Sequence, residues 1–367
     1  MSLKPNRTLL ALLALPFLLL PCNEAQAAQH PLVKDLDFQR FKDNIETLAD
    51  FGDRLSGTLG NENSVDWLDA ELQAMGYTPD RMTVTTGSGT AENIWVTKIG
   101  TTSPDKMYIV SAHIDGLGGG GAADDDASGV SLVLELARVV APADVTTDIS
   151  IRFVLWNYEE QGCGGSALYA EERVDLQGIE DPPGSGLYPE PTWLGMIQHD
   201  MILFDHGLPP GPDQIPEADI DIEYQASAPF AAESLVLAQQ LLAGNVAHST
   251  DYPAEIGDNM CCTDSRIFDN YTAAVSVREN RRIGEIGAGS NPHWHRSTDV
   301  FENFSEADFR LGFNAAQMTL GTLTQLLSIE VGLFSDSFET GDTTSWSSSL
   351  GLAIPEAPRG QLLAGDR

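Results

Sequence analysis

Three consecutive aspartates lie in one short loop, just before a predicted helix. They are Asp124, Asp125 and Asp126, in the stretch GAADDDASG. Carboxylates this close repel one another and raise one another's pKa values unless a positive charge lies among them. Two interpretations are open: a solvated acidic turn that caps the following helix, or a binding site for a metal ion. The other polar motifs of the sequence distinguish between these two interpretations.

Histidines and carboxylates also follow the neighbouring apolar runs of the chain. The motifs SAHIDG, NYEEQG, QHDM and NPHWHRSTD supply His113 and Asp115, Glu159 and Glu160, Asp200, and His295. Each of these residues alone is more often structural than functional, as a packed core histidine or part of an exposed turn. Two imidazoles together with several carboxylates, however, are the ligand set of divalent ions, zinc above all. Their placement after successive strands therefore favours a metal site.

The elements that must position these residues form an α/β pattern. The segments 93–99, 107–113 and 150–157 are β-branched, aromatic and almost continuously apolar, which is typical of strands buried on both faces. A helix is predicted between the last two of these strands, and strand, helix and strand then form a crossover unit. Binding sites in such sheets form outside the carboxyl ends of the strands, where the polar residues stand. Helices are predicted over 38–51, 63–75, 127–140, 229–243 and 305–327, and further strands over 193–203 and 273–278.

A glycine-rich stretch, GLGGGG from Gly116 to Gly121, formally matches a dinucleotide-binding fingerprint between a strand and a helix. Three aspartates stand between these glycines and the helix, where a pyrophosphate would have to bind. Repulsion between the anions argues strongly against a nucleotide. We expect instead a flexible loop that leads into the acidic site.

The formal net charge of −34 is unusual for a globular chain. Nucleic acids and anionic membranes are polyanions, so neither is an expected partner. No segment beyond the N-terminus is long and apolar enough for a membrane span, and we expect no stable membrane association. The charge fits an exported protein that self-repulsion keeps soluble.

The N-terminus has the features of a secretory signal peptide. Lys4 and Arg7 precede an apolar run from Leu9 to Leu20, and the small-x-small sequence AQA follows at 25–27. We therefore expect residues 1–27 to be removed and the mature protein to be secreted or periplasmic.

The other end of the chain also differs from the middle. After Leu327 the composition changes to Ser, Thr, Gly and Asp, so residues 331–367 are predicted to be a low-complexity tail. The mature chain keeps Cys163, Cys261 and Cys262, which in an oxidising compartment allow one disulfide and leave one thiol over.

The motifs above, in this order and spacing, resemble the secreted dinuclear-zinc aminopeptidases of the bacterial leucyl aminopeptidase type, relatives of glutamate carboxypeptidase II and glutaminyl cyclase. The matching pieces are SAHIDG, GAADDDASG, NYEEQG, the aspartate of QHDM and the H-x-x-x-D of 295–299. The upstream stretch DRLSGTLGNENSVDWLDAEL resembles the N-terminal helix of that family. The resemblance implies a mixed, largely parallel central sheet flanked by helices, of the zinc exopeptidase type, in a single catalytic domain over 28–330. It also implies peptide substrates and two zinc ions per chain.

The resemblance further implies a metal ligand in each of the matching motifs. The expected zinc ligands are His113, Asp125, Glu160, Asp200 and His295. Asp125, the middle aspartate, would bridge both ions. His113 and Asp200 would complete one site, and Glu160 and His295 would complete the other.

Three further carboxylates receive roles from the same resemblance. Glu159 would be left unligated as the general base, and a hydroxide held between the two metals would attack the peptide. Asp115 would orient His113 from behind. Asp126 would cap the helix, after a cis peptide bond.

An exported zinc aminopeptidase is therefore the main hypothesis, and three alternatives stay open. A carboxypeptidase or dipeptidase could use the same metal core, and so could a glutaminyl cyclase. A non-catalytic binding protein would be expected to lack a ligand or the base, and none is missing. A carboxypeptidase needs a cation to clamp the terminal carboxylate, and the candidates are Arg266, Arg278, Arg281, Arg282 and Arg296.

Two positions depart from the family pattern. Trp294 precedes His295, where some relatives have a tyrosine that could stabilise the oxyanion. Ser265 follows Asp264, where relatives often show Asp-His.

Overall fold

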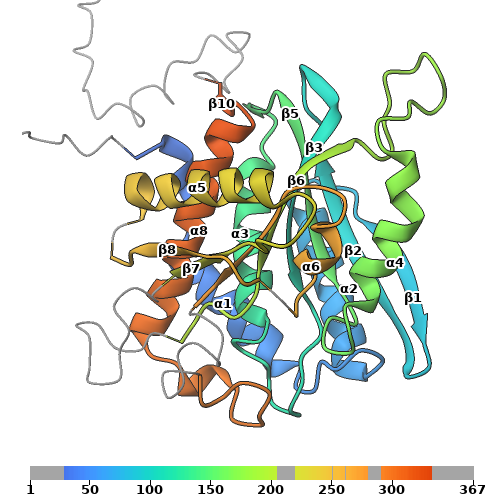
Figure 1. The fold of residues 1–367 in the computed structure, drawn as a ribbon. Coiled ribbons are helices and arrows are strands. Elements are labelled where there is room, and N and C mark those ends of the chain that lie inside the picture. Colours follow the sequence, from blue (N-terminus) through green and yellow to red (C-terminus); the bar gives the residue numbers. More distant parts are fainter. Residues whose placement is uncertain (1–28, 205–219, 250, 261, 280–290, 333–367) are drawn as a thin grey trace, which may run out of the picture.

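The computed structural model describes residues 29–204, 220–249, 251–260, 262–279 and 291–332 (Figure 1). Its centre is an eight-stranded sheet in the order β1-β2-β5-β3-β6-β9-β7-β8. The strands are β1 (Asp80–Thr86), β2 (Gly89–Lys98), β3 (Ser103–His113), β5 (Ile149–Trp156), β6 (Thr192–His199), β7 (Ile220–Glu223), β8 (Ala254–Gly257) and β9 (Ala274–Arg278). A separate two-stranded sheet pairs β4 (Val145–Thr146) with β10 (Glu330–Val331).

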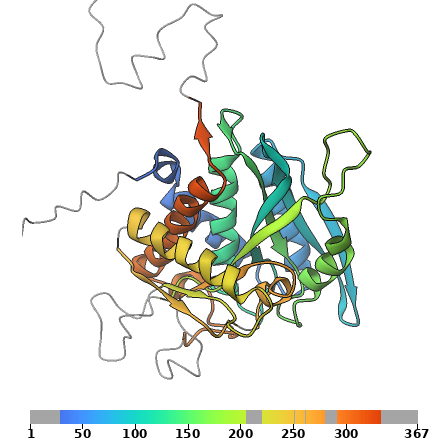
Figure 2. The same ribbon diagram turned by 45° about the horizontal axis from the view of Figure 1, so that its top comes forward.

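Helices cover both faces of the large sheet. They are α1 (Phe38–Asp50), α2 (Leu59–Ala74), α3 (Ala127–Val140), α4 (Gly164–Arg173), α5 (Ala231–His248), α6 (Ser265–Phe268) and α8 (Glu306–Leu326). The 3-10 turns are η1 (Pro31–Asp35), η2 (Val174–Leu176) and η4 (Phe301–Asn303). Figure 2 shows α3, α5 and α8 on one side of the sheet and α4 on the other. The larger hydrophobic cluster fills the α3 side, and an aromatic cluster that includes Trp156, Tyr169 and Phe268 fills the α4 side.

The pairing of the strands confirms the predicted mixed, largely parallel sheet. β3 pairs in parallel with both β5 and β6, and β6 pairs in parallel with β9. Antiparallel pairs occur where β1 meets β2, β2 meets β5, and β7 meets β9. Because β3, β5, β6 and β9 run in one direction, the residues that follow them meet at one edge of the sheet.

Several predicted elements differ in their ends, and some were not predicted. α2 begins at Leu59 rather than at 63, because the side chain of Thr58 accepts a hydrogen bond from the Asn61 amide and caps the helix there. β6 ends at His199, so Asp200 lies after the strand. α4, β1, β7 and β8 were not predicted from the sequence.

α4 shows why a pattern-based prediction missed it. The helix begins with two glycines, which usually argue against a helix. A Cβ on Gly165 would collide with the backbone oxygen of Asn157 and the side chain of Asn93, so the close approach of helix and sheet needs a glycine at this position.

Several sequence-based predictions lie outside the described residues. These are the signal peptide, Cys261, Arg281 and Arg282, and the tail beyond residue 332. Within the described residues, Cys163 has a free thiol and Cys262 takes part in a disulfide. None of the helices in that part of the chain combines the length and the apolar character that a membrane crossing requires.

Candidate metal centre

Asp126 connects the end of β3 to the start of α3 through hydrogen bonds. Its carboxylate accepts a hydrogen bond from the Gly129 amide at 2.9 Å, which caps α3, and another from the His113 amide at 3.1 Å. The peptide bond between Asp125 and Asp126 is cis, as the family resemblance implies. With Asp126 turned inward toward strand and helix, the neighbouring Asp125 faces the edge of the sheet.

Asp125 stands between two histidines. Its Oδ1 lies 3.2 Å from His113 Nε2, and its Oδ2 lies 3.2 Å from His295 Nε2. On the first side, Asp200 Oδ1 is 3.8 Å from His113 Nε2. On the second side, Glu160 Oε2 is 2.9 Å from His295 Nε2. The structure therefore brings the five expected ligands together as two groups that share Asp125.

These two groups fit divalent cations. In each group the ligand atoms lie within 4.8 Å of one another, a spacing that allows one ion to contact all three. The second oxygen of Glu160, Oε1, is buried without a hydrogen-bond partner. A buried carboxylate oxygen needs a partner, and a cation would supply one. Imidazole and carboxylate donors suit zinc.

Asp115 adjoins His113, as the resemblance implies, but its backbone oxygen lies closer to the ring than its side chain does. Its carboxylate lies 3.8 Å from His113 Nδ1, beyond hydrogen-bond distance, whereas its backbone oxygen lies 2.9 Å from that nitrogen. The carboxylate accepts instead from the amides of Glu159 at 3.2 Å and Glu160 at 3.3 Å. The carbonyl of Asp115 thus orients the histidine, and its side chain holds the turn that carries the two glutamates.

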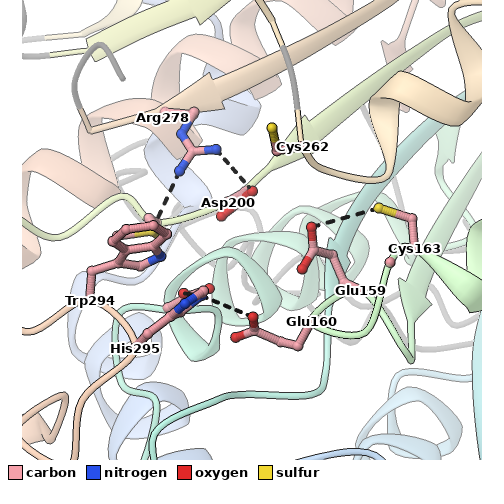
Figure 3. A pocket seen from close by; sticks show the side chains of 11 residues that line it. Glu159, Glu160, Cys163, Asp200, Cys262, Arg278, Trp294 and His295 are labelled. Carbon is pink, nitrogen blue, oxygen red and sulfur yellow. Dashed lines mark hydrogen bonds and ion pairs between the residues drawn. The ribbon is translucent and has the colours of Figure 1, made fainter. Parts of the chain in front are cut away.

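Glu159 and Glu160 point in different directions, as Figure 3 shows. Glu160 faces His295, whereas Glu159 stands apart from both ligand groups and its Oε1 lies 3.8 Å from the thiol of Cys163. Burial raises the pKa of Glu159 to about 10, and nearby Asp200, Asp264 and Asp125 add to the shift. Burial and Asp125 likewise raise the pKa of Glu160 to about 7.

The histidines show the complementary effect. Burial favours the neutral ring of His295, but its contacts with Asp125 and Glu160 raise its pKa to about 10. Burial also opposes the charged form of His113, yet the surrounding carboxylates raise its pKa well above the usual value. Divalent cations placed among these groups would stabilise ionised carboxylates and neutral imidazoles, which is the protonation state that metal ligands need.

The other two aspartates of the triplet build the loop around Asp125. Asp124 is fully buried and accepts hydrogen bonds from the Leu203 amide at 2.9 Å and from Asn291 Nδ2 at 2.6 Å. Asp299 accepts from the amides of Asp124 at 2.9 Å and Asp125 at 3.1 Å. The aspartate of the H-x-x-x-D motif is therefore a support for the central carboxylate, a role the sequence did not reveal.

A pocket of ≈ 330 Å³ opens beside the two ligand groups. Glu159 and Cys163 line one part of it, and Cys262, Arg278 and Trp294 line another (Figure 3). Met201 also belongs to the lining. Among the described residues, Arg278 is the only lysine or arginine in its lining. Its Nη1 lies 3.2 Å from Asp200 Oδ2.

The structure shows the contacts of Trp294 and Ser265, the two residues that depart from the family pattern. The ring of Trp294 packs on that of His295, with centroids 4.3 Å apart, and lines the pocket. The Ser265 hydroxyl contacts Met260 Sδ at 3.1 Å. Asp264, just before it, is buried and accepts from Ser166 at 2.5 Å and from Gln198 at 3.3 Å.

Proteins of similar sequence were found among curated proteins. Leupeptin-inactivating enzyme 1 of Streptomyces exfoliatus is 28% identical over 161 residues, which cover 41% of this chain and 36% of that protein. LpqL of Mycobacterium tuberculosis, described as a probable lipoprotein aminopeptidase, is 24% identical over 259 residues, which cover 66% of this chain and 47% of the relative. The chain therefore spans less than half the length of both relatives.

Solved structures show the same fold. The LapA aminopeptidase of Legionella pneumophila superposes with a TM-score of 0.63 at 18% identity, over 82% of this chain and 74% of that one. A glutaminyl cyclase of Porphyromonas gingivalis superposes with a TM-score of 0.58 at 18% identity, over 82% of this chain and 99% of the other. At such identities the likeness extends to the fold alone.

A family model gives the more specific assignment. The model of Peptidase family M28 matches residues 93–318, which include both ligand groups and both glutamates of the NYEEQG motif. Since this match covers more than half of the chain, and the fold and the grouped ligands agree with it, the chain belongs to peptidase family M28.

Proposed function

We propose that this chain is an exported zinc aminopeptidase, which hydrolyses N-terminal residues from peptides and holds two zinc ions through the two ligand groups. The arrangement that carries the proposal is Asp125 between His113 and His295, with Glu159 free of both groups beside the pocket. The name of the Mycobacterium relative supports the aminopeptidase activity. Export rests on the signal-peptide features of residues 1–27.

Two zinc ions, held by His113, Asp125 and Asp200 and by Asp125, Glu160 and His295, would supply a Lewis acid for the scissile carbonyl and would make a water molecule more acidic. Glu159, which lines the pocket and belongs to neither ligand group, would serve as the general base. Burial raises the pKa of Glu159 in the absence of metal; cations in the two ligand groups would lower it again and leave a carboxylate that can accept a proton and pass it to the departing amine. The Cys163 thiol donates a long hydrogen bond, of 3.8 Å, to this carboxylate.

The substrate's α-amine has several carboxylates within reach in the pocket. Asp125, Glu159 and Asp200 all line it; Glu159, which belongs to neither ligand group, can accept a hydrogen bond from an amine. The strong negative charge of the chain adds a field that favours cationic peptide termini. The pocket therefore suits a free N-terminus better than a free carboxyl terminus.

A carboxypeptidase is the second candidate, because one arginine does reach the pocket. Of the residues that could clamp a terminal carboxylate, Arg278 lines the pocket, whereas Arg266 pairs with Asp269 outside its lining. The guanidinium of Arg278 already contacts Asp200. This pairing favours a role in holding Asp200 over a role in binding substrate.

The direction of attack can be tested with blocked and unblocked substrates. We expect hydrolysis of a free aminoacyl anilide and none after N-acetylation, because the acetyl group removes the amine that the carboxylates hold. A chelator should abolish the activity and zinc should restore it. Cleavage of an N-acetylated peptide from its carboxyl end at a comparable rate would instead establish the carboxypeptidase.

Glutaminyl cyclase activity is tested in the same preparation with a peptide that begins with glutamine. A structural neighbour of this chain is such an enzyme. The aminopeptidase proposal expects release of free glutamine. Formation of a pyroglutamyl peptide without release of the first residue would contradict it.

A further inference from the structure

Arg54 is a buried arginine that lies outside the pocket and that the mechanism above does not use. It stands between α1 and α2, in the DRLSGTLG stretch, and only 1% of it is exposed. Among the described residues, no carboxylate lies within ion-pair distance of it. A cation in such a place needs a strong set of partners.

The partners of Arg54 are backbone carbonyl groups. Nε donates to the oxygen of Ile114 at 3.0 Å, and Nη2 donates to the oxygen of Ala122 at 3.0 Å. Nη1 donates to the oxygen of Leu48 at 3.2 Å and also to that of Gly121. The carbonyl of Arg54 itself accepts from the amide of Gly116 at 3.3 Å.

These carbonyls belong to the two ends of one loop. Ile114 directly follows His113, and Ala122 precedes Asp125 by three residues, so the guanidinium bridges the start and the end of the segment between two metal ligands. The loop is rich in glycine, with Gly118 and Gly119 at positive φ, and would have little stiffness of its own. The planar fork of an arginine, with five donors in fixed directions, is well suited to such bridging.

The charge of Arg54 also faces the site. Burial lowers its pKa, but Asp299, Asp126, Asp115 and Asp125 act in the opposite direction and favour the charged form. The buried positive charge of Arg54 therefore offsets part of the mutual repulsion among these closely spaced aspartates.

We propose that Arg54 is a positioning residue for the metal centre, which clamps both ends of the 114–122 loop and so sets the spacing between His113 and Asp125. The inference rests on the proposed zinc site. Groups that orient metal ligands typically contribute about 10- to 100-fold to metal affinity. Loss of the clamp should therefore weaken zinc binding by a factor in that range.

The test measures zinc affinity directly, by competition with a chromophoric chelator, in full-length protein carrying Arg54→Met. A matched control is Arg152→Met, which removes another buried arginine, one that pairs with Glu190 at 2.6 Å on the α4 side of the sheet. We expect zinc binding to be about 10- to 100-fold weaker in the first variant and unchanged in the second. Equal affinities in Arg54→Met and the wild type would overturn the role, as would equal weakening in both variants.

A milder variant keeps the proposal testable if Arg54→Met does not fold. Arg54→Lys retains the charge and loses the fork, so its cobalt(II) form should show an altered visible absorption spectrum and a weaker metal affinity than the wild type. A wild-type spectrum and affinity in Arg54→Lys would contradict the clamp. Wild-type protein that binds zinc tightly but has no peptidase activity would contradict the proposed function alone, whereas wild-type protein that binds no zinc would contradict both.

Discussion

Glu159 and Glu160 are adjacent in the chain, yet only Glu160 belongs to a ligand group. Glu160→Ala removes a proposed ligand and should lower the zinc content. Glu159→Gln keeps the size of the side chain and should leave about two zinc ions per chain, the number that such two-metal sites hold, while turnover falls by at least about 100-fold, as expected when a general base is lost. Elemental analysis and an anilide assay on both purified variants measure these effects. Equal loss of zinc in the two would contradict the division of roles.

Arg278 permits a second test at the scale of one residue. Its contact with Asp200 Oδ2, at 3.2 Å, leaves Oδ1 facing His113. If the guanidinium serves to orient Asp200, Arg278→Met should weaken zinc binding and lower kcat for free and amidated dipeptides alike. A rise in KM confined to substrates with a free carboxyl terminus would identify a carboxylate clamp. Arg266→Met, outside the pocket lining, is the matched control.

What the sequence could reveal at this scale was the residue types and their order. Two histidines and several carboxylates after successive strands indicated a metal site before any geometry was known. The partners of Asp115 could not be predicted, because the same residue offers a carbonyl and a carboxylate and only the folded backbone decides which one faces His113. Arg54 gave no signal beyond its family stretch, since a buried cation that binds carbonyls has no charged partner in the sequence.

At the scale of elements, His199 joins β6 to α8. Its Nε2 lies 2.9 Å from the Thr319 hydroxyl, and burial lowers its pKa to about 3. An unfolded histidine has a pKa near 6.5, so between these values the unfolded chain binds more protons than the native one. This contribution to stability is fully present above about pH 6.5 and is lost as the pH falls toward 3.

Replacing His199 should make the free energy of unfolding depend less steeply on pH below pH 7. In chelator-treated protein, the wild type should lose about 2–3 kcal/mol more of its free energy of unfolding than His199→Asn between pH 7 and pH 4.5. Urea unfolding at the two pH values measures the difference, in which the contributions of other titrating groups largely cancel. Parallel profiles for the two proteins would show that His199 does not carry the effect.

The elements that could be predicted were those with strong local signals. α3 was predicted with its observed bounds, because its apolar run is long and Asp126 caps its start. β7 and β8 have four residues each, too few for a periodic pattern to distinguish them from loop. The antiparallel pairing of β7 with β9 depends on long-range contacts that no local pattern records.

At the scale of the whole molecule, the fold class followed from the alternation of strands and a helix, and the position of the site followed from the rule that strand ends gather at one edge. Which of the charged residues are buried could not be predicted from the sequence. The total of −34 led us to expect no polyanionic partner, but it does not show that several of the carboxylates, among them Asp124 and Asp126, are fully buried as supports of one loop. Burial of such groups is a property of the complete packing.

The extent of the folded domain gives a last prediction. The C-terminal segment FSDSFETGDTTSWSSS has few apolar residues, so removing residues 333–367 should leave the melting temperature and the activity nearly unchanged. The boundary itself lies later than the change in composition suggests. β10 pairs with β4 over Glu330–Val331, Ile329 is 7% exposed, and the Gly332 amide donates to the oxygen of Asp144 at 2.8 Å.

Two truncations therefore separate the tail from the domain. A chain that ends at Gly332 keeps all of these contacts. A chain that ends at Ser328 loses β10 and the buried side chain of Ile329, whose burial alone contributes about 1.5–3 kcal/mol, so it should melt several degrees lower at equal pH and zinc concentration. Calorimetry on both proteins and the full-length chain compares them directly. If the chain ending at Gly332 melts as low as the shorter one, the tail packs on the domain and the predicted boundary is wrong.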